Sequence, residues 1–535
     1  MLKMRQSNLL ELFFGFCFLS LSLSFFTLPT FAQGVYEAWV VRYNGPVDSF
    51  DYASALAVDG SGNVYVTGYG YGSGTNYDYA TIKYSSFGDT LWVRRYNEPG
   101  NSYDVARALA VDDSGNVYVT GYSYASGTAQ DYATIKYSSS GDALWVRRYN
   151  GPGNSSDFAS ALAVDGSGNV YVTGESHGSG TNYDYATIKY NSAGDTVWVR
   201  RYNGPGNGSD VADALAVDDS GNVYVTGGSI GSGTHYDYAT IKYSPFGDTL
   251  WVRRYNEPGN VVDVAYALAV DASGNVYVTG GSVGSGIYTD YATIKYSSSG
   301  DTLWVRRYNG PGNSYDYADA LVIDDSGNVY VTGDSYGSGT GYDYATIKYS
   351  SAGDTLWVRR YNGPENVVDQ ANALKVDASG NVYVTGYSAG GVTGFDYATI
   401  KYSSAGDALW VRRYNGPGNN YDYANALAVD DSGNVYVTGY SDEGSGTYYD
   451  YVTIKYSPCT SANPKAGDAN GDGEVNLADI IFKVAYVFKG GPKPNPSCRA
   501  DDNADTKINL SDIIYEVNYI FKGGPKPLPI GACCL

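Results

Sequence analysis

One heptapeptide, Gly-Asn-Val-Tyr-Val-Thr-Gly, recurs at a constant spacing and constrains the fold more than any other feature of the chain. Its eight copies start 53 residues apart, at Gly62, Gly115, Gly168, Gly221, Gly274, Gly327, Gly380 and Gly433. All eight tryptophans keep the same step, at Trp39, Trp92, Trp145, Trp198, Trp251, Trp304, Trp357 and Trp410. A fixed period near 50 residues predicts a propeller, a solenoid or an array of small units.

Each repeat contains four segments with strand character. In the first repeat they are residues 55–58, 63–67, 79–84 and 90–96, which are rich in β-branched and aromatic residues and bounded by Gly, Asp, Asn or Ser. Tight turns join the first segment to the second and the third to the fourth. Four antiparallel strands per repeat predict a propeller blade, because a parallel β-helix has a shorter rung and no such hairpins.

The two ends of the array indicate a closed ring. Residues 39–43 read as a fourth strand without the first three, and residues 450–456 as a third strand without a fourth. If these segments pair, all blades are complete and no sheet edge stays open. We therefore predict an all-β, eight-bladed propeller of 53-residue, four-stranded repeats over residues 36–457. The tryptophans are expected in the core.

The repeated polar residues fit a scaffold role. Asp78, Lys83, Arg94 and Arg95 have counterparts in the other repeats, which suggests a ladder of ion pairs. The string Asp-x-x-Gly-Asn-Val-Tyr-Val-Thr-Gly followed by Asp-Tyr-Ala-Thr-Ile-Lys-Tyr resembles the bacterial β-propeller repeat family, a class of extracellular repeats. The resemblance covers roughly four-fifths of the chain. It implies the propeller fold and sets no activity.

The eight copies differ mainly in two places, between the second and third strands and between the fourth strand and the next blade. In an up-and-down blade both places lie on one face, and the nearly constant hairpins lie on the other. Drift of loops would have altered the hairpins as well, so we expect a ligand-binding face for carbohydrate or protein. The expected residues are Tyr69, Tyr71, Tyr103, Tyr122, Tyr124, Glu175, His177, Tyr315, Asp334, Tyr336, Tyr387, Tyr421 and Tyr440.

No catalytic residues are predicted. Nearly all ionisable residues recur in each repeat, whereas an active site needs an asymmetric set of groups. His177 and His235 lie in different repeats without metal-ligand spacing, and no Ser-His-Asp order or His-Glu-x-x-His motif is present. An enzyme would require an unequal carboxylate pair on the variable face, for example near Glu175 and Asp334.

The N-terminal residues 1–32 are predicted to be a secretory signal. Lys3 and Arg5 precede an apolar run over residues 12–26, and Thr30-Phe31-Ala32 supplies a small residue for cleavage. No later apolar stretch approaches the length of a membrane span, so no transmembrane segment is expected after signal removal. The formal charge of −21 argues against a nucleic-acid partner. We expect a secreted, extracellular or cell-surface protein.

A second module follows the repeats. Residues 458–465 are predicted to be a linker, 466–526 a small α-helical calcium-loop domain and 527–535 a tail. Two acidic loops 33 residues apart each precede an apolar-striped helix and the same Phe-Lys-Gly-Gly-Pro-Lys-Pro sequence. Oxygen-bearing residues at loop positions 1, 3, 5, 9 and 12, with a backbone carbonyl at 7, predict EF-hand-like sites for two Ca²⁺ ions.

The expected ligands are Asp468, Asn470, Asp472, Glu474, Asn476, Asp479, Asp501, Asn503, Asp505, Lys507, Asn509 and Asp512. Thr506 stands where the first loop has Gly473 at its sharp turn, so the second site is expected to be weaker. The duplicated loop and helix resemble a type I dockerin, which implies calcium-dependent docking to a cohesin-like partner. The positions matching the partner contacts are Leu477, Ala478, Leu510 and Ser511, which are not the usual hydroxyl pair.

Four cysteines, Cys459, Cys498, Cys533 and Cys534, follow the repeats. They allow three pairings, among which the sequence does not choose, although a bond between Cys459 and Cys498 is favoured. Export permits disulfides.

The main hypothesis is a secreted, non-enzymatic binding protein whose propeller face recognises a polysaccharide or a surface protein and whose tail docks to a cohesin-like domain. Dockerins usually tether polysaccharide-degrading enzymes, so the second hypothesis is a glycoside hydrolase or lyase of a cellulosome-like assembly. A structural surface protein without a ligand is the third.

Overall fold

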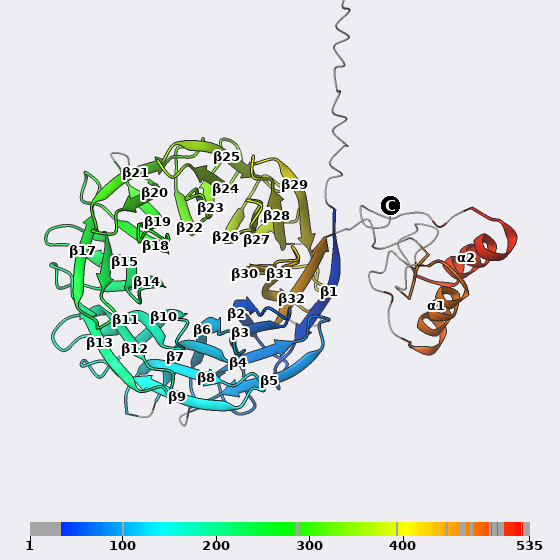
Figure 1. The fold of residues 1–535 in the computed structure, drawn as a ribbon, viewed down its shortest axis with the longest axis horizontal. Coiled ribbons are helices and arrows are strands. Elements are labelled where there is room, and N and C mark those ends of the chain that lie inside the picture. The colour runs from blue at the N-terminus through cyan, green and yellow to red at the C-terminus, as the bar shows by residue number, and fades with distance from the viewer. Residues whose placement is uncertain are drawn as a thin grey trace, which may run out of the picture. The chain divides into compact units, whose positions relative to one another are not determined.

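The computed structural model describes residues 34–98, 101–125, 127–284, 288–391, 394–444, 448–458, 467–470, 474–491, 494, 500, 508–525 and 527. Within these ranges the chain forms 32 strands and two helices (Figure 1). The predicted secretory signal and all four cysteines after the repeats lie outside the described residues.

The strands form eight antiparallel sheets of four strands each, which confirms the predicted eight-bladed propeller. Blade 1 comprises β2 (Asp51–Val58), β3 (Val64–Tyr71), β4 (Tyr77–Tyr84) and β5 (Thr90–Tyr96). Blade 2 comprises β6 (Asp104–Val111), β7 (Val117–Tyr124), β8 (Gln130–Tyr137) and β9 (Ala143–Tyr149), and blade 3 comprises β10 (Asp157–Val164), β11 (Val170–His177), β12 (Tyr183–Tyr190) and β13 (Thr196–Tyr202). Blade 4 comprises β14 (Asp210–Val217), β15 (Val223–Ile230), β16 (Tyr236–Tyr243) and β17 (Thr249–Tyr255), and blade 5 comprises β18 (Asp263–Val270), β19 (Val276–Val283), β20 (Thr289–Tyr296) and β21 (Thr302–Tyr308). Blade 6 comprises β22 (Asp316–Ile323), β23 (Val329–Tyr336), β24 (Tyr342–Tyr349) and β25 (Thr355–Tyr361), and blade 7 comprises β26 (Asp369–Val376), β27 (Val382–Ala389), β28 (Phe395–Tyr402) and β29 (Ala408–Tyr414).

Blade 8 combines the two ends of the array. It contains β30 (Asp422–Val429), β31 (Val435–Asp442) and β32 (Tyr449–Pro458), and its outermost strand is β1 (Val35–Tyr43). β1 pairs antiparallel with β32, with Val40 opposite Ile454, and Figure 1 shows the blue β1 beside the orange β32. The pairing predicted from the incomplete ends is therefore what closes the ring.

A tyrosine hydroxyl joins each blade to the next. Tyr79 of β4 donates to the backbone oxygen of Ala133 in β8 at 3.1 Å, and the counterpart in blade 8, Tyr451, donates to Ala80 at 3.2 Å. Bonds of this kind cross all eight blade junctions. A buried hydroxyl must find a partner, so this bond also fixes the spacing of neighbouring blades.

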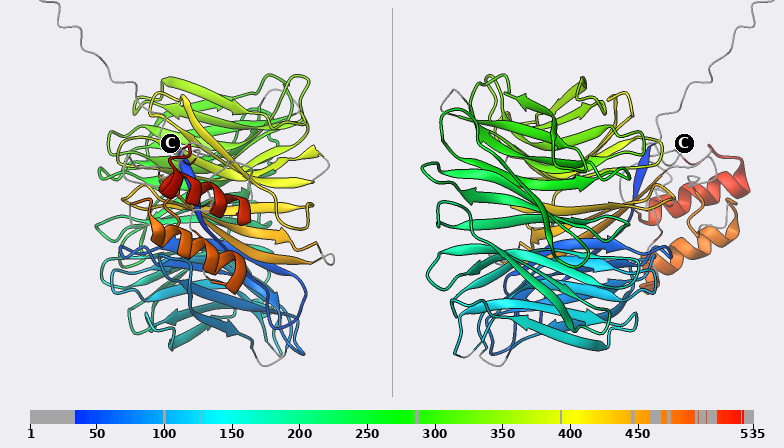
Figure 2. Two further views of the ribbon diagram at one scale, coloured as in Figure 1. Left: turned by 90° about the vertical axis from the view of Figure 1, so that its right-hand side faces the viewer. Right: turned by 60° about the vertical axis from the view of Figure 1, so that its left-hand side comes forward.

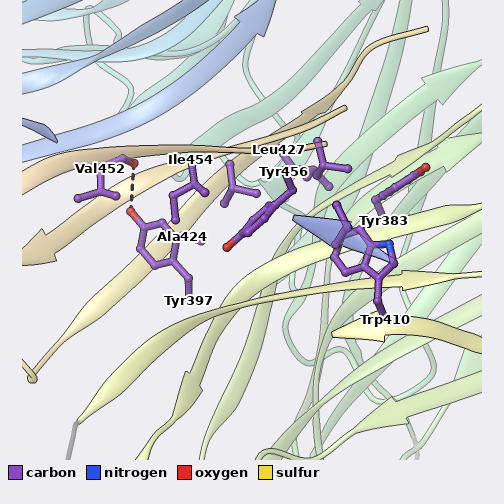
Figure 3. Close-up of a cluster of buried hydrophobic side chains, with 11 residues drawn as sticks. Tyr383, Tyr397, Trp410, Ala424, Leu427, Val452, Ile454 and Tyr456 are labelled. Atoms are coloured by element: carbon purple, nitrogen blue, oxygen red, sulfur yellow. Dashed lines mark hydrogen bonds between the residues drawn. The ribbon is translucent and has the colours of Figure 1, made fainter. Parts of the chain in front are cut away.

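The hydrophobic core lies between the blades. At the junction of blades 7 and 8, Tyr383, Tyr397 and Trp410 from blade 7 face residues of β30 and β32 (Figure 3). The seven tryptophans from Trp92 to Trp410 are 6–8 % exposed, which confirms their predicted core position. Every blade also contains the expected Arg–Asp ion pair, at 2.7–3.5 Å. The lysines instead lie over tyrosine rings, as Lys83 does over Tyr65 at 4.9 Å.

Two features of the inner strands differ from the sequence prediction. The first and second strands extend further toward the variable face than expected, so Tyr69 and Tyr71 lie in β3 rather than in a loop. Cross-strand packing accounts for the extension, because Tyr69 is paired with both Tyr52 and Tyr79. The innermost strand of every blade also has a shift of register, between Ala53 and Ala55 in blade 1.

The C-terminal part contains α1 (Leu477–Lys489) and α2 (Leu510–Lys522), which lie side by side (Figure 2). Asn476 and Asn509 cap the two helices, and Gly490 and Gly523 end them with φ angles of 65° and 66°. Lys483 of α1 and Glu516 of α2 form a fully buried ion pair at 2.7 Å. The two residues occupy equivalent positions of the duplication, so this contact joins one repeat to the other.

Candidate binding face

The structure brings the variable columns together at one end of the ring. In seven of the eight blades, the residue before the first strand accepts a backbone hydrogen bond from the end of the second strand: Tyr71 N–H donates to Phe50 at 3.2 Å, and Tyr124 N–H donates to Tyr103 at 3.2 Å. The hairpins Asp59–Gly62 and Ser85–Gly88 turn at the opposite ends of the strands. We call the two ends the variable face and the constant face.

The first hairpin on the constant face is held by one aspartate. The carboxylate of Asp59 accepts hydrogen bonds from the N–H groups of Ser61 and Asn63, from the Asn63 amide and from the Tyr65 hydroxyl, all at 2.8–2.9 Å. Burial opposes ionisation of this group, but the hydrogen bonds prevail and lower its pKa. The same network recurs in the other blades, for example around Asp112.

The second hairpin joins neighbouring blades. The backbone oxygen of Ser139 accepts from both Lys83 and Trp92 of the preceding blade at 3.2 Å, and Gly141 accepts from Arg94 at 2.6 Å. These bonds explain why the hairpins barely change between repeats. Their constancy has a structural reason, so the contrast with the variable loops does not by itself indicate ligand binding, and the ligand-binding face stays a prediction.

Aromatic side chains gather on the variable face over blades 7, 8 and 1. The ring of Tyr52 lies 5.2 Å from that of Tyr69 and 4.8 Å from that of Tyr440, and Tyr423 lies 4.8 Å from Tyr387. We call this continuous set the aromatic arc; its members are Phe50, Tyr52, Tyr69, Tyr71, Tyr77, Tyr103, Tyr387, Phe395, Tyr421, Tyr423, Tyr440, Tyr448 and Tyr449.

Smaller aromatic groups lie on other blades of this face. Tyr122 packs on Phe158 at 4.9 Å, and the His177 ring lies 5.5 Å from Tyr183. Tyr315 and Tyr336 are 40 % and 38 % exposed on blade 6, so they are accessible to a partner, as are Tyr103 and Tyr421 of the arc at 44 % and 40 %. Most other predicted face residues are half-buried, and Asp334 is buried.

The bulge on each innermost strand supplies a set of residues that the sequence analysis missed. The extra residues are Ser54, Arg107, Ser160, Asp213, Tyr266, Asp319, Asn372 and Asn425. A bulge re-aims its side chain, and the side-chain amides of Asn372 and Asn425 each donate to the next blade at 2.8 Å. This column varies completely between repeats although it lies within a strand, and that variation could have identified it. Ser54, Asn372 and Asn425 line a hub cavity of ≈ 590 Å³.

Carboxyl groups concentrate on blades 3, 4 and 6, and those of blade 6 lie near Tyr387 of the aromatic arc. Asp319 and Asp334 lie on the neighbouring strands β22 and β23 of blade 6, and their carboxyl groups influence each other's ionisation. Burial and the neighbouring Asp334 charge raise the pKa of Asp319 well above its usual range, and burial raises that of Asp334 to about 7. In blade 4, burial, with a contribution from Glu175, raises the pKa of Asp213 to about 7. We call Glu175, Asp213, Asp319 and Asp334 the acidic arc.

The two carboxyl groups named as an example of an enzymatic pair do not lie in one blade. Glu175 belongs to blade 3 and Asp334 to blade 6.

In the C-terminal part, several predicted calcium ligands support the helix starts. The Asp479 carboxylate accepts from Asn476 N–H at 2.8 Å and from Asn470 N–H at 3.1 Å, which draws the loop toward the helix. Asp512 accepts from Asn509 N–H at 2.8 Å. Asp472, Asp501, Asn503, Asp505 and Lys507 lie outside the described residues, as does Thr506.

The remaining placements concern the metal and partner positions. Asp468 is buried and Glu474 is exposed. Within the described ranges, no cluster of three His, Cys, Asp or Glu side chains is arranged to hold a metal ion. Leu477 and Leu510 are 52 % and 50 % exposed, and Ala478 and Ser511 are exposed beside them. The helices in the described part of the chain are too short or too polar to span a membrane.

Comparison with known proteins supports the repeat architecture. Residues 91–127, 144–181, 303–339, 356–392 and 409–445 match the family model of the beta-propeller repeat (SBBP). An uncharacterised WD repeat-containing protein, L264 of Acanthamoeba polyphaga mimivirus, is 22 % identical over 518 residues, which cover 79 % of this chain and 34 % of that protein. The chain thus spans about a third of the length of that relative.

Two solved structures share only a distant likeness. A eukaryotic initiation factor aligns over 67 % of this chain and 78 % of its own with 8 % identity and a TM-score of 0.39. XC5397 from Xanthomonas campestris, a gluconolactonase, aligns over 66 % of this chain and 98 % of its own with 13 % identity and a TM-score of 0.31. Five segments of the chain, each reaching from the outermost strand of one blade into the next blade, thus match the beta-propeller repeat family, and the protein is an eight-bladed propeller with a distant WD-repeat relative.

Proposed function

We propose that this is an exported binding protein whose variable face recognises a protein partner. The aromatic arc carries the proposal, because it gathers over three of the eight blades and so gives the variable face one distinct region. Tyrosine supplies a large, rigid contact and a hydroxyl at low entropic cost, and it is enriched in protein-binding surfaces.

The arrangement of the rings favours a protein over a carbohydrate. Many ring pairs within the arc are edge-to-face, with interplanar angles of 82° for Tyr52 and Tyr440 and 74° for Tyr387 and Tyr423. In such a pair the edge of one ring covers the flat face of the other, so that face is not available to stack on a sugar. Tyr103, Tyr421, Tyr315 and Tyr336, which are accessible, belong to three different blades or the loops before them. A broad surface with separated anchors matches a protein epitope better than a sugar ring stacked in a cleft.

Selection from a random peptide library, run in parallel with a glycan array, tests the proposal. The double variant Tyr103→Ala with Tyr421→Ala is expected to bind selected peptides at least about tenfold more weakly, as for loss of an interface anchor. Phe87→Ala is the control, because Phe87 is 83 % exposed on the constant face. Glycan binding that depends on the arc would show that the ligand is a carbohydrate rather than a protein. Peptide binding by the double variant as strong as that of the parent protein would contradict the proposal.

We further propose that the C-terminal part is a calcium-dependent docking module that resembles a type I dockerin. Carboxylate and amide oxygens are the ligands that Ca²⁺ prefers. The first loop and the start of α1 supply Asp468, Asn470, Asn476 and Asp479, and the backbone N–H groups of Asn470 and Asn476 both donate to the Asp479 carboxylate. Asn509 and Asp512 repeat this arrangement. Bound Ca²⁺ would neutralise the loop carboxylates, and its cohesin-like partner would contact the exposed ends of α1 and α2.

Calorimetry on the full chain tests this second proposal. Titration with Ca²⁺ is expected to show two binding events, the weaker one from the second loop, and Asp468→Ala should remove the tighter one. Chelation should abolish a separate unfolding transition while leaving that of the ring in place. Absence of binding heat, or loss of both transitions together, would contradict it.

A further inference from the structure

Four open clefts lie between neighbouring blades on the constant face. They occur within the described residues at the junctions of blades 8 and 1, 2 and 3, 4 and 5, and 6 and 7, with volumes of ≈ 410, 460, 400 and 470 Å³ respectively. Each is bordered by the first hairpins of both blades, the lysine of the leading blade and a hairpin serine of the following one. Volumes in this range suit small ligands.

These four junctions share a chemical feature. The residue after the hairpin aspartate is Asp113, Asp219, Asp325 and Asp431 in the even-numbered blades, and Gly60, Gly166, Ala272 and Ala378 in the odd-numbered ones. Each of the four clefts has an even-numbered blade as its leading blade, so an additional carboxylate lines it. The alternation therefore marks every second junction.

A serine also recurs at the next position of the first hairpin in every blade. Ser61, Ser114, Ser167, Ser220, Ser273, Ser326, Ser379 and Ser432 occupy this position in the eight blades. All eight are exposed, and among the described residues none of their hydroxyls makes a hydrogen bond; only their N–H groups do. The neighbouring position varies among Gly, Asp and Ala, so the serine is constant beside a residue that is free to change.

The cleft between blades 8 and 1 contains both hydrogen-bond donors and hydrogen-bond acceptors. Asp431 supplies a carboxylate, Ser432 and Ser61 supply hydroxyls, and Lys455 supplies an ammonium group that already donates to Ser86 at 3.1 Å. Val58 and Val429 add apolar surface. A carboxylate beside hydroxyls and an ammonium group matches vicinal hydroxyl groups, which both donate and accept.

The chemistry does not match a metal ion. The carboxylate of the hairpin residue Asp430 is already occupied by four donors, at 2.8–3.0 Å. Each cleft therefore offers a single uncommitted carboxylate, whereas a hard cation needs six or more oxygen ligands.

We propose that these four clefts are saccharide-binding sites, each formed by the Asp-Ser pair of an even-numbered blade and the serine of the next blade. They are separate from the variable face and make the ring multivalent. Four weak sites on one rigid ring can hold a repetitive polysaccharide far more tightly than one site could.

Calorimetric titration of the full chain with a panel of mono- and disaccharides tests the proposal. The expected stoichiometry is four saccharides per chain, falling to three in Asp431→Gly. The combined variant Asp113→Gly, Asp219→Gly, Asp325→Ala and Asp431→Gly is expected to bind at least about tenfold more weakly. Each replacement is a residue that odd-numbered blades already carry at this position, so the ring should still fold, and its unfolding temperature checks this.

A second variant and two controls complete the test. Ser61→Ala with Ser432→Ala should remove one site, while Phe246→Ser on the same face and Tyr103→Ala on the variable face should leave the saccharide titration unchanged. No binding of any saccharide at millimolar concentration, a stoichiometry of one, or full binding by the combined variant would overturn the proposal. Loss of saccharide binding in Tyr103→Ala would also overturn it, whereas peptide binding at the variable face is unaffected by any of these outcomes.

Discussion

The two faces of the ring differ in what their side chains are bonded to. On the constant face, each hairpin aspartate accepts four hydrogen bonds, and the second hairpin receives bonds from the preceding blade. On the variable face, Tyr103 and Tyr421 are 44 % and 40 % exposed, although their backbone oxygens accept hydrogen bonds from Tyr124 and Asp442. The comparison shows that repeated side-chain bonds fix the hairpins of the constant face, whereas the variable face carries exposed aromatic side chains in addition to Arg–Asp pairs and inter-blade Arg–Tyr bonds.

The largest expected effect concerns the constant face. Asp112→Ala removes the acceptor for Ser114, Asn116 and the half-buried Tyr118 hydroxyl and should lower the free energy of unfolding by roughly 2–4 kcal/mol. The adjacent Asp113 is exposed, so Asp113→Ala should change stability by less than about 0.5 kcal/mol. Thermal unfolding of both variants measures this difference. Equal losses would mean that the face is not held by its hairpin aspartates.

A smaller effect is expected from the acidic arc. Since burial raises the pKa values of Asp319 and Asp334, the folded ring binds more protons than the unfolded chain between about pH 4 and 7, and stability falls as the pH rises through this window. Asp319→Asn removes one of the two charges and should stabilise the ring at about pH 8 by on the order of 1–2 kcal/mol, since one pKa unit equals about 1.4 kcal/mol.

At about pH 5, where the pair already holds its protons, Asp319→Asn should have little effect. Unfolding temperatures of the variant and the parent protein across this pH range provide the measurement. A constant difference at all pH values would show that the pair does not titrate as described.

The smallest effect on stability is expected from the exposed tyrosines. Tyr103→Ala and Tyr421→Ala should each change the free energy of unfolding by less than about 0.5 kcal/mol, because neither side chain is buried. If either variant unfolds as readily as Asp112→Ala, the variable face is also part of the scaffold, and the comparison of the two faces fails.

Much of the scaffold could be predicted from the sequence. The 53-residue step, the four strand-like segments and the incomplete ends led to the closed ring, and β1 does pair with β32. The recurring Arg and Asp residues led to the ion pair that every blade contains. Such features can be predicted because comparison of the eight repeats distinguishes the residues that recur in every blade from those that vary.

Less of the candidate site could be predicted from the sequence. The bulge at Ser54 and its counterparts interrupts a strand that reads as regular, so Asp213 and Asp319 could not be placed at the hub from local pattern alone. The calcium-loop prediction stays untested, since much of each loop lies outside the described residues.

The sequence by itself determined the number of blades, their strand order and the closure of the ring, because a repeated pattern of short apolar strands has one way to bury its faces and pair its ends. Only the tertiary structure decided which side chains meet between blades. Tyr52 and Tyr440 are 388 positions apart in the chain, yet their rings lie 4.8 Å apart. Contacts of this kind depend on ring curvature and strand register, which no single repeat contains.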